Sequence, residues 1–143
     1  MMTHQRTTVQ DWMTENLITV APDEPLFAAV EQMAEQAIRH VLVCERGQLR
    51  GIVSNRDIVR ATLKNSERRL ELHDITIGEV MTRGPLATVQ PTTPVEEAAQ
   101  LMVGNHCNAL PVISGGHPVG ILTSDDLLRA LSLRASAPAR PDM

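Results

Sequence analysis

The chain has 143 residues, enough for one ordinary domain or for two half-domains that share a core. Its formal net charge of −4 argues against nucleic acid as a partner, because nucleic acid is bound chiefly through neutralised phosphates. No apolar run approaches the roughly 20 residues of a membrane span, and the polar first residues lack the apolar core of a signal peptide. We therefore expect a cytoplasmic protein with no nucleic-acid or membrane partner.

Taken in chain order, the predicted elements form one set that occurs twice. Apolar residues at helical spacing indicate helices, and short apolar runs between turn residues indicate strands. In the first copy the elements are a helical turn at 9–13, an extended segment at 17–20, a helix at about 26–34, strands at 40–44 and 51–53, and a helix that begins at 54. In the second copy they are found at 77–81, 86–89, about 95–103, 109–113 and 120–122, with a helix that begins at 123. Each copy is close to β-α-β-β-α, so the fold class is predicted to be α+β.

The repeat is clearest in the stretches 51–58 and 120–127. Each consists of a glycine, a short apolar strand, a hydroxyl residue, two polar residues, an aspartate and an apolar residue. Gly51 and Gly120 are 69 positions apart, and so are Asp57 and Asp126. A period of this length indicates two copies of a small αβ unit and not a solenoid.

The repeat sets the predicted domain boundaries. Residues 1–8 are expected to be flexible, because no apolar period begins before residue 9. Repeat 1 is predicted over 9–66, a charged linker over 67–76, and repeat 2 over 77–134. The Ala/Pro-rich end at 135–143 is expected to be disordered.

The two cysteines are expected to be buried structural residues. Cys44 and Cys107 align through the repeat with isoleucines, so both occupy apolar positions, where a free cysteine behaves as a small hydrophobe. A disulfide or a reactive thiol is the less favoured alternative. His106 lies beside Cys107 but no second ligand pair has a usual spacing, so no metal site is expected.

The hydroxyl and acidic residues of the repeated stretch allow two interpretations. Ser54 and Thr123 each precede an aspartate by three residues, which is close to a capping box, although Glu or Gln is more usual there. The same geometry suits a ligand, because a helix N-terminus offers N–H groups and a positive dipole to a phosphate. A carboxylate one turn into the helix can also accept hydrogen bonds from vicinal hydroxyls, as on a ribose. Spacing alone leaves helix capping and nucleoside-phosphate binding both open.

The complete order of motifs resembles a tandem pair of CBS domains, the cystathionine β-synthase-type regulatory module. The likeness covers roughly residues 9 to 132, and although any single motif is weak, the whole order occurs twice. The residues that carry it are Met13-Thr14 and Met81-Thr82, Pro22 and Pro91, the strand that ends at Val43, the run Ala109-Leu110-Pro111-Val112, and both Gly…Ser/Thr-x-x-Asp stretches. Leu42 departs from the family, which commonly has proline there, as Pro111 does. We expect this change to affect strand entry and not function.

The resemblance implies two pseudo-two-fold-related βαββα repeats that form one CBS pair, a Bateman-type module. It also implies a regulatory ligand bound between the repeats, with AMP, ADP or ATP foremost, and S-adenosylmethionine or an NAD-type dinucleotide as the other candidates. No obligatory cofactor is implied. The ligand-binding residues that the resemblance implies are Ser54, Asp57, Thr123, Asp126, Arg39, His40, Arg56, Thr19, Val20, Thr88 and Val89.

In the roles so implied, Asp57 and Asp126 hold the ribose of two separate sites, and the hydroxyl residue three positions earlier assists. Backbone groups near 18–20 and 87–89 read the adenine.

The phosphate neighbours implied for the first site are basic. Arg39 and His40 stand where the first helix leads into a strand, and Arg56 is also within reach of a phosphate. Their counterparts in the second copy are Asn108, Ala109 and Asp125. We infer that the two sites are unequal. The alternative is that Arg39 and Arg56 are solvated surface charges and that His40 is a hydrogen-bonded surface histidine.

Three functions follow as hypotheses. The first is a stand-alone, non-enzymatic sensor that binds an adenine nucleotide and signals its occupancy to an unknown client protein. The second is an interaction or dimerisation scaffold without a ligand, in which the Ser/Thr-x-x-Asp pairs only cap helices. The third is a small enzyme or redox protein that uses Cys107. It is the weakest, because the sequence contains no nucleophile with a neighbouring base at a meaningful spacing and no glycine-rich phosphate loop. A homodimer is expected, with the apolar helix positions Leu127, Leu128 and Leu131 as candidate contacts.

Overall fold

The computed structural model describes residues 7–15, 17–65 and 71–135. The predictions of a flexible start at 1–8 and a disordered end at 135–143 lie almost wholly outside these residues, as does the first part of the predicted linker. Within the described residues no helix is long and apolar enough to cross a membrane.

The described chain forms two compact units whose boundaries cut across the sequence repeat. The Asp57 unit comprises residues 16–86 and 116–118, and the Asp126 unit comprises 1–15, 87–115 and 119–143. Each unit therefore combines the hairpin and long helices of one repeat with the short helical turn of the other.

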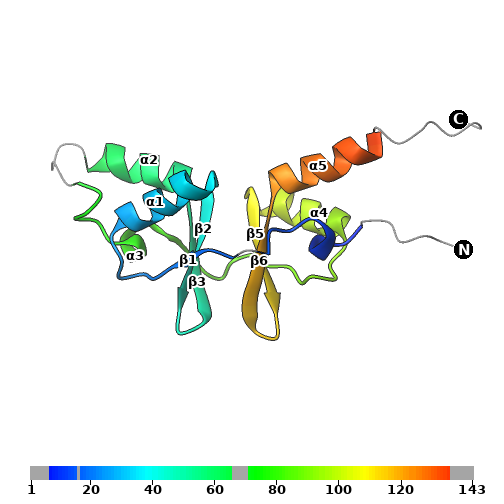
Figure 1. Ribbon diagram of the computed structural model, residues 1–143, viewed down its shortest axis with the longest axis horizontal. Coiled ribbons are helices and arrows are strands. Elements are labelled where there is room, and N and C mark those ends of the chain that lie inside the picture. Colours follow the sequence, from blue (N-terminus) through cyan, green and yellow to red (C-terminus); the bar gives the residue numbers. More distant parts are fainter. Residues whose placement is uncertain (1–6, 16, 66–70, 136–143) are drawn as a thin grey trace, which may run out of the picture. The chain divides into compact units, whose positions relative to one another are not determined.

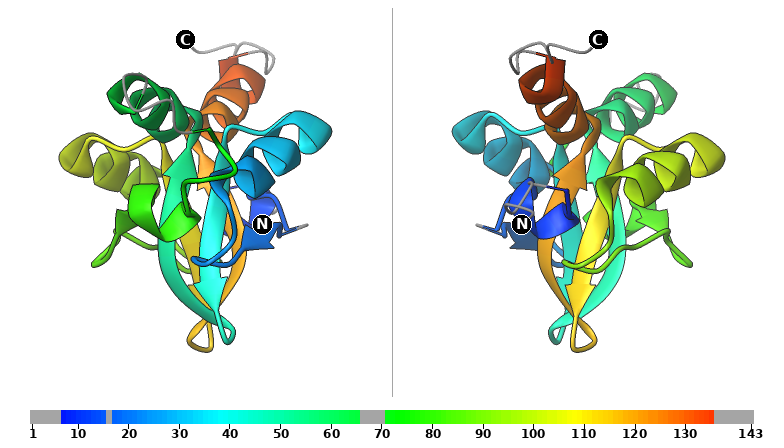
Figure 2. Two further views of the ribbon diagram at one scale, coloured as in Figure 1. Left: turned by 90° about the vertical axis from the view of Figure 1, so that its left-hand side faces the viewer. Right: turned by 90° about the vertical axis from the view of Figure 1, so that its right-hand side faces the viewer.

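The Asp57 unit is a four-stranded sheet with helices on one face (Figures 1 and 2). Its elements are β1 (Thr19–Val20), α1 (Leu26–Gln36), β2 (His40–Glu45), β3 (Gln48–Ser54), α2 (Asn55–Lys64), α3 (Ile77–Val80) and β4 (Thr82–Arg83). The strand order is β1-β2-β3-β4, in which β1 pairs with β2 in parallel and the other pairs are antiparallel.

The Asp126 unit repeats this plan around a two-stranded hairpin, again with its helices on one face (Figures 1 and 2). Its elements are the 3-10 turn η1 (Val9–Asp11), α4 (Val95–Asn105), β5 (Ala109–Ser114), β6 (His117–Thr123) and α5 (Ser124–Ala135). Isolated bridges join Val89 to Val112 and Thr14 to Ile121, in the places that β1 and β4 occupy in the Asp57 unit.

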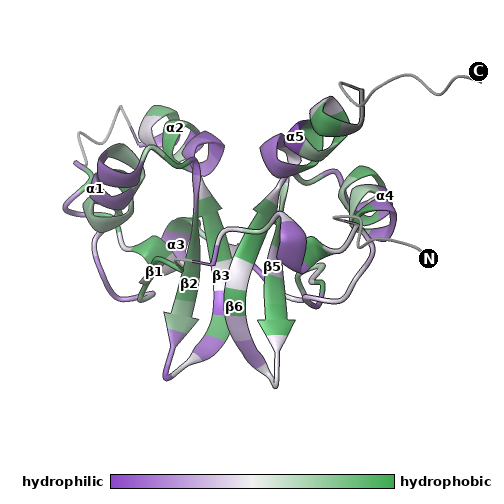
Figure 3. Ribbon diagram, turned by 45° about the vertical axis from the view of Figure 1, so that its right-hand side comes forward, coloured by the Kyte–Doolittle hydropathy of each residue, from purple (hydrophilic) through white to green (hydrophobic). Residues whose placement is uncertain are grey.

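Alternating strand residues and one stripe of each helix supply an aliphatic core to each unit. In the Asp57 unit Val41 and Val43 of β2 pack with Leu26, Ala29 and Met33, which recur at helical spacing in α1. The Asp126 unit has the same arrangement. Its buried cluster comprises Val9, Trp12, Val89, Val95, Ala98, Met102, Leu110, Val112, Leu122 and Ala130. Strand β5 is accordingly hydrophobic over most of its length (Figure 3).

Backbone hydrogen bonds fix the short helical turn of one repeat to the other repeat. In the Asp57 unit the Ile77 N–H donates to the Glu24 carbonyl at 2.9 Å. In the Asp126 unit the Val9 N–H donates to the Thr93 carbonyl at 2.8 Å, and the Val95 N–H donates to the Thr7 carbonyl at 2.9 Å. The repeats are therefore intertwined, and neither unit is one continuous piece of chain.

The glycine of each repeated stretch is required by the segment that crosses it. A Cβ on Gly51 would lie 2.6 Å from the Thr82 carbonyl oxygen and 2.8 Å from the Met81 Sδ. A Cβ on Gly120 would lie 2.8 Å from the Thr14 carbonyl oxygen. Glycine allows this close backbone approach because it has no side chain.

The predicted short helical turns, long helices and hairpins are present, and the two segments predicted as strand or extended differ in how far they pair. The extended segment expected at 86–89 forms only the single bridge at Val89, whereas its counterpart forms the strand β1. The reason is Pro111, which stands where the Asp57 unit has Leu42. Proline has no N–H to donate to the carbonyl groups that precede Val89, so the parallel ladder cannot extend. Strand β4 was not predicted.

Replacement of Gly51 by alanine is expected to lower the free energy of unfolding by about 1–3 kcal/mol, because the added methyl overlaps a strand carbonyl. Urea unfolding measures the change. The matched control is Gly104→Ala in α4, where an added Cβ meets nothing within 4 Å. That variant is expected to gain up to about 1 kcal/mol from helix propensity. Equal stability of Gly51→Ala and the wild type would contradict the close-approach explanation.

Candidate functional site

A reciprocal hydrogen-bond pair holds Asp57 at the start of α2. The Ser54 N–H donates to Asp57 Oδ2 at 2.9 Å, and the Asp57 N–H donates to Ser54 Oγ at 3.1 Å. This is the predicted capping box, with aspartate in place of the usual Glu or Gln. Two of the helix's otherwise unpaired N–H groups are thereby satisfied.

The second repeat builds the same pair at the start of α5. The Thr123 N–H donates to Asp126 Oδ2 at 2.8 Å, and the Asp126 N–H donates to Thr123 Oγ1 at 3.3 Å. In both aspartates, one carboxylate oxygen thus accepts the hydrogen bond of the cap. Helix capping is a real role of these residues, and any ligand would have to use the oxygen that remains.

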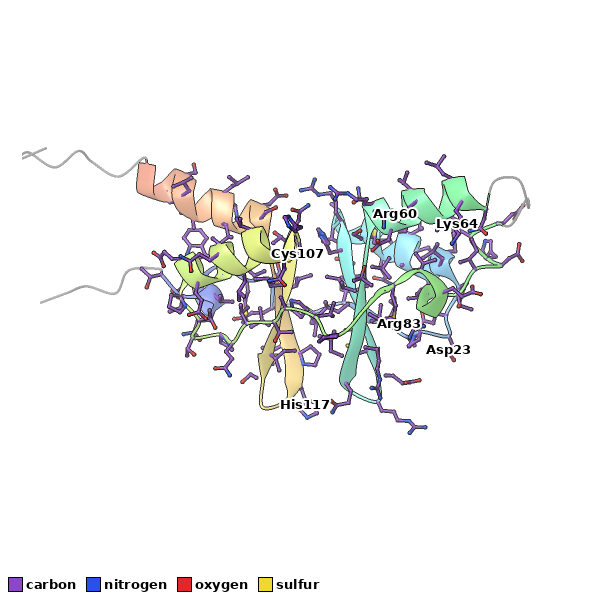
Figure 4. The ribbon with its side chains drawn as sticks, turned by 180° about the vertical axis from the view of Figure 1, so that it is seen from behind. Asp23, Arg60, Lys64, Arg83, Cys107 and His117 are labelled. Atoms are coloured by element: carbon purple, nitrogen blue, oxygen red, sulfur yellow. The ribbon has the colours of Figure 1, made fainter. Side chains whose placement is uncertain are left out.

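The remaining carboxylate oxygen differs between the two aspartates. Asp57 Oδ1 is 3.9 Å from the nearest nitrogen of Arg60, too far for a hydrogen bond, and the Asp57 side chain is 12% exposed. Asp126 Oδ1 accepts a hydrogen bond from Arg129 Nη2, and the Asp126 side chain is 4% exposed. Arg60 lies on α2, as does Lys64 (Figure 4).

Basic residues lie at the same end of the Asp57 unit as the capped aspartate. In the strand register His40 is opposite Ser54, and the Asn55 N–H donates to the Arg39 carbonyl at 3.0 Å. Arg56 is the second residue of α2 and is exposed. The structure therefore brings together five of the predicted site residues: Arg39, His40, Ser54, Arg56 and Asp57.

The same corner of the Asp126 unit carries no basic residue at the equivalent positions. The Ser124 N–H donates to the Asn108 carbonyl at 2.8 Å, which reproduces the backbone bond of the other unit. The side chains at this corner are those of Asn108, Ala109 and Asp125. The backbone frame is conserved between the units, while the charge is not.

The segments predicted to read adenine occupy the edge of the sheet beside β2 and beside β5. Thr19 pairs with Leu42 and Val20 pairs with Val43, which places β1 near the strand that starts at His40. Thr19 is exposed and Val20 is buried. In the Asp126 unit Thr88 is exposed and Val89 is buried, with its N–H bound to the Pro111 carbonyl at 3.1 Å.

A pocket of about 720 Å³ lies between α4 and α5 and shares Asn108 and Ser124 with the Asp126 corner. Its walls are mainly aliphatic, and neither Thr123 nor Asp126 lines it. The lining residues are Val95, Glu96, Ala99, Met102, Val103, His106, Cys107, Asn108, Ser124, Leu127, Leu128, Ala130 and Leu131. Of these residues, only Leu127, Leu128 and Leu131 were predicted from the sequence as apolar contacts, and Val103 of α4, which is 76% exposed, was missed.

The cysteines are free and only partly buried, in contrast to the buried positions predicted for them. Burial raises the pKa of Cys44, and burial also raises the pKa of Cys107 despite an opposing backbone hydrogen bond at Ala109. Cys107 lies where α4 leads into β5 (Figure 4). In the described ranges no three side chains of the metal-binding types His, Cys, Asp and Glu gather in one place.

Both thiols are expected to react more slowly with a maleimide in the native protein than in urea at about pH 8, because the folded state disfavours the thiolate. Because the thiol pKa values are raised in the folded state, the thiols of the unfolded chain lose their protons at lower pH. The free energy of unfolding is therefore expected to fall as pH rises above the ordinary thiol pKa of about 8.5. Rapid native labelling of Cys107 with an apparent pKa below that of a free thiol would contradict this and revive the redox hypothesis.

Comparison with known proteins places this geometry in a family. The family model for the CBS domain matches twice, at residues 9–64 and 77–133. A CBS domain-containing protein of Dictyostelium discoideum is 33% identical over 133 residues, which span 86% of this chain and 90% of the relative.

The chain is also similar to a solved structure and to part of an enzyme. The structure is the CBS domain pair of protein MJ0100 in complex with 5′-methylthioadenosine and S-adenosyl-L-methionine. It is 28% identical, has a TM-score of 0.80, and matches over 90% of this chain and 98% of the other. A homoserine O-acetyltransferase of Methanohalobium evestigatum is 32% identical over 127 residues, which cover 87% of this chain but only 24% of the enzyme. With an α+β fold, two matched repeats and a neighbour of this kind, the chain belongs to the CBS domain family as a tandem CBS pair.

Proposed function

We propose that this protein is a non-enzymatic regulatory module that binds an adenine nucleotide (AMP, ADP or ATP) and signals its occupancy to a partner protein. The observation that carries the proposal is the open Oδ1 of Asp57, held by a completed cap at a corner with Arg39, His40 and Arg56. The adenosyl compounds in the similar CBS pair of protein MJ0100 support the ligand class.

Each part of an adenine nucleotide has a matching group at this corner. The two hydroxyls of the ribose donate to the partly exposed carboxylate of Asp57, and charge-assisted bonds of this kind contribute about 1.5–3 kcal/mol each. The phosphate binds near the first turn of α2, where the helix dipole and the side chain of Arg56 are both favourable. The adenine is read by backbone groups beside β1, which has exposed Thr19 next to buried Val20.

S-adenosylmethionine is the second adenosyl candidate. It shares the adenosine that Asp57 recognises, but it carries a sulfonium in place of the phosphates. The basic residues of this corner favour an anionic ligand, so we rank a nucleotide first.

Signalling requires that the nucleotide bind one arrangement of the protein more tightly than another. A ligand shifts such an equilibrium only by its differential affinity for the two states. The client protein is then one that binds the two states unequally.

The alternative is a scaffold whose capping boxes have no further role. Its specific support is that in both boxes the hydroxyl residue and the aspartate form the full reciprocal pair of hydrogen bonds. The two functions differ in what the second oxygen of Asp57 does.

A thermal-unfolding panel with AMP, ADP, ATP, S-adenosylmethionine and guanosine nucleotides is expected to show stabilisation by an adenine nucleotide alone. A ligand at about 100 times its Kd that binds only the native state stabilises it by about 2.7 kcal/mol. Asp57→Asn is expected to abolish this shift, because asparagine keeps one oxygen for the cap but loses the second acceptor. No shift with any adenosyl compound would contradict the sensor and favour the scaffold.

The matched control is Asp11→Asn. Asp11 caps η1 through the Thr8 N–H at 3.1 Å, outside either candidate site. This variant is expected to keep the nucleotide-dependent shift, so that loss in Asp57→Asn alone separates binding from capping.

We further propose that the protein is a homodimer joined through α4 and α5. The groove between these helices is lined in part by the exposed Leu128 and Leu131 (62% and 61% exposed), so each copy offers the same apolar patch to another. A two-fold interface pairs the same patch on both copies and needs this property. The predicted contact Leu127 is only partly exposed, because it also packs against the core.

Leu128→Glu is expected to convert the dimer to a monomer in sedimentation at micromolar concentration, because it places a charge in the apolar contact. Gln100→Glu is the control, since it adds the same charge to an exposed position of α4 that does not line the groove. A monomeric wild type, or a dimer that survives Leu128→Glu, would contradict the interface.

A further inference from the structure

We infer that the two aspartate sites are not equivalent, and that each chain binds a single phosphate-bearing adenosine ligand, at Asp57, while Arg129 occupies the second site's carboxylate. The inference rests on the proposed function and specifies which site acts and what it accepts. Three observations on the described residues lead to it.

The first observation concerns the acceptor oxygens. The caps take Oδ2 of both aspartates in the same way, at 2.9 Å from the Ser54 N–H and 2.8 Å from the Thr123 N–H. Recognition of a ribose therefore depends on Oδ1. This oxygen lies beyond hydrogen-bond distance of Arg60 in Asp57, whereas in Asp126 it accepts a bond from Arg129.

The second observation concerns accessibility. The Asp126 side chain is 4% exposed, against 12% for Asp57. A sugar hydroxyl that approached Asp126 would have to displace the guanidinium of Arg129 from a buried carboxylate. The Arg129 side chain is itself 63% exposed, so displacing it costs the charge-assisted bond to the buried carboxylate and not the cost of breaking a fully buried ion pair.

The third observation concerns the charge at the phosphate position. The backbone bonds Asn55 N–H to Arg39 carbonyl and Ser124 N–H to Asn108 carbonyl show that the two corners have the same frame. The side chains change from basic to neutral or acidic in every pair compared: Arg39 to Asn108, His40 to Ala109, and Arg56 to Asp125. The first corner therefore places basic side chains where a phosphate would lie, whereas at the equivalent positions of the second corner the only charged side chain is the carboxylate of Asp125.

The first two observations both describe the Arg129–Asp126 contact, while the third concerns other residues and acts in the same direction. Arg60 and Arg129 occupy matching positions, three residues after the aspartate, so their different contacts supply a matched comparison within one chain. Arg129 is accordingly a specificity-determining residue that excludes the nucleotide from the second corner.

Isothermal titration calorimetry with AMP tests the inference on the full chain. The wild type is expected to bind one AMP per chain. Asp57→Asn is expected to lose binding, while Asp126→Asn is expected to keep one AMP with its affinity changed less than threefold. Arg60→Ala is the control for removal of an arginine, and it is expected to bind one AMP per chain, as the wild type does.

The double variant Asp125→Asn/Arg129→Ala is expected to bind two AMP per chain, because it removes both the pairing cation and the repelling carboxylate. If the double variant binds only one AMP per chain, the role assigned to Arg129 is overturned. If this variant fails to fold, the comparison of Asp57→Asn with Asp126→Asn still decides which site acts.

Two further outcomes separate this inference from the proposed function. Two AMP per wild-type chain, or binding that is lost in Asp126→Asn and kept in Asp57→Asn, would overturn the inference and leave the nucleotide sensor intact. Absence of heat with every adenosyl compound, accompanied by no thermal shift, would overturn the sensor itself.

Discussion

The close crossing of a Met-Thr segment over a strand glycine is the constraint on which the rest of the fold depends. Met81 and Thr82 lie against Gly51, and Met13 and Thr14 lie against Gly120. Each contact joins residues from different repeats, so the crossing places the short helical turn of one repeat on the core of the other. The sheets, the cores and the ends of the long helices are positioned around these two crossings.

The capping box at the start of α2 leaves one side chain able to serve both a structural role and the proposed binding role. A carboxylate has two oxygens, and the cap of Asp57 uses one of them. The cap fixes the side-chain rotamer, which lowers the entropy that a ligand would otherwise lose on binding the second oxygen. Capping and ligand recognition are thus compatible at Asp57, and the choice between them that spacing suggested is not a true alternative.

Much of the fold could be predicted because its signals are local. Ser54 and Thr123 mark the helix starts through their own side chains, and the apolar period of 26–34 shows which face of α1 is buried. The crossing segments could not be predicted, because which strand Met81 and Thr82 meet depends on contacts with residues about 30 positions away. Strand β4 and the composition of the two compact units were missed for the same reason.

The candidate site, like the fold, could be predicted only in part from the sequence. The residues at the Asp57 corner were found because they belong to one repeated motif and to the strand that pairs with it. The unequal charge of the two corners was predicted from the sequence, but the contact of Arg129 with Asp126 was not, since Arg60 and Arg129 occupy equivalent positions in the sequence. Only the side-chain contacts and burial distinguish them.

The intertwined connection also has a consequence for the order in which the protein folds during synthesis. All but the hairpin tip at 116–118 of the Asp57 unit is available once residue 86 has left the ribosome. The segment with Val9 and Trp12, although made first, has its packing partners in strands and helices that follow residue 87. Domains generally fold as units, with the N-terminal one first. In this chain Val9 and Trp12 can reach their packing partners only after those later residues are made, and Trp12, as the only tryptophan, would report the moment when the second unit closes.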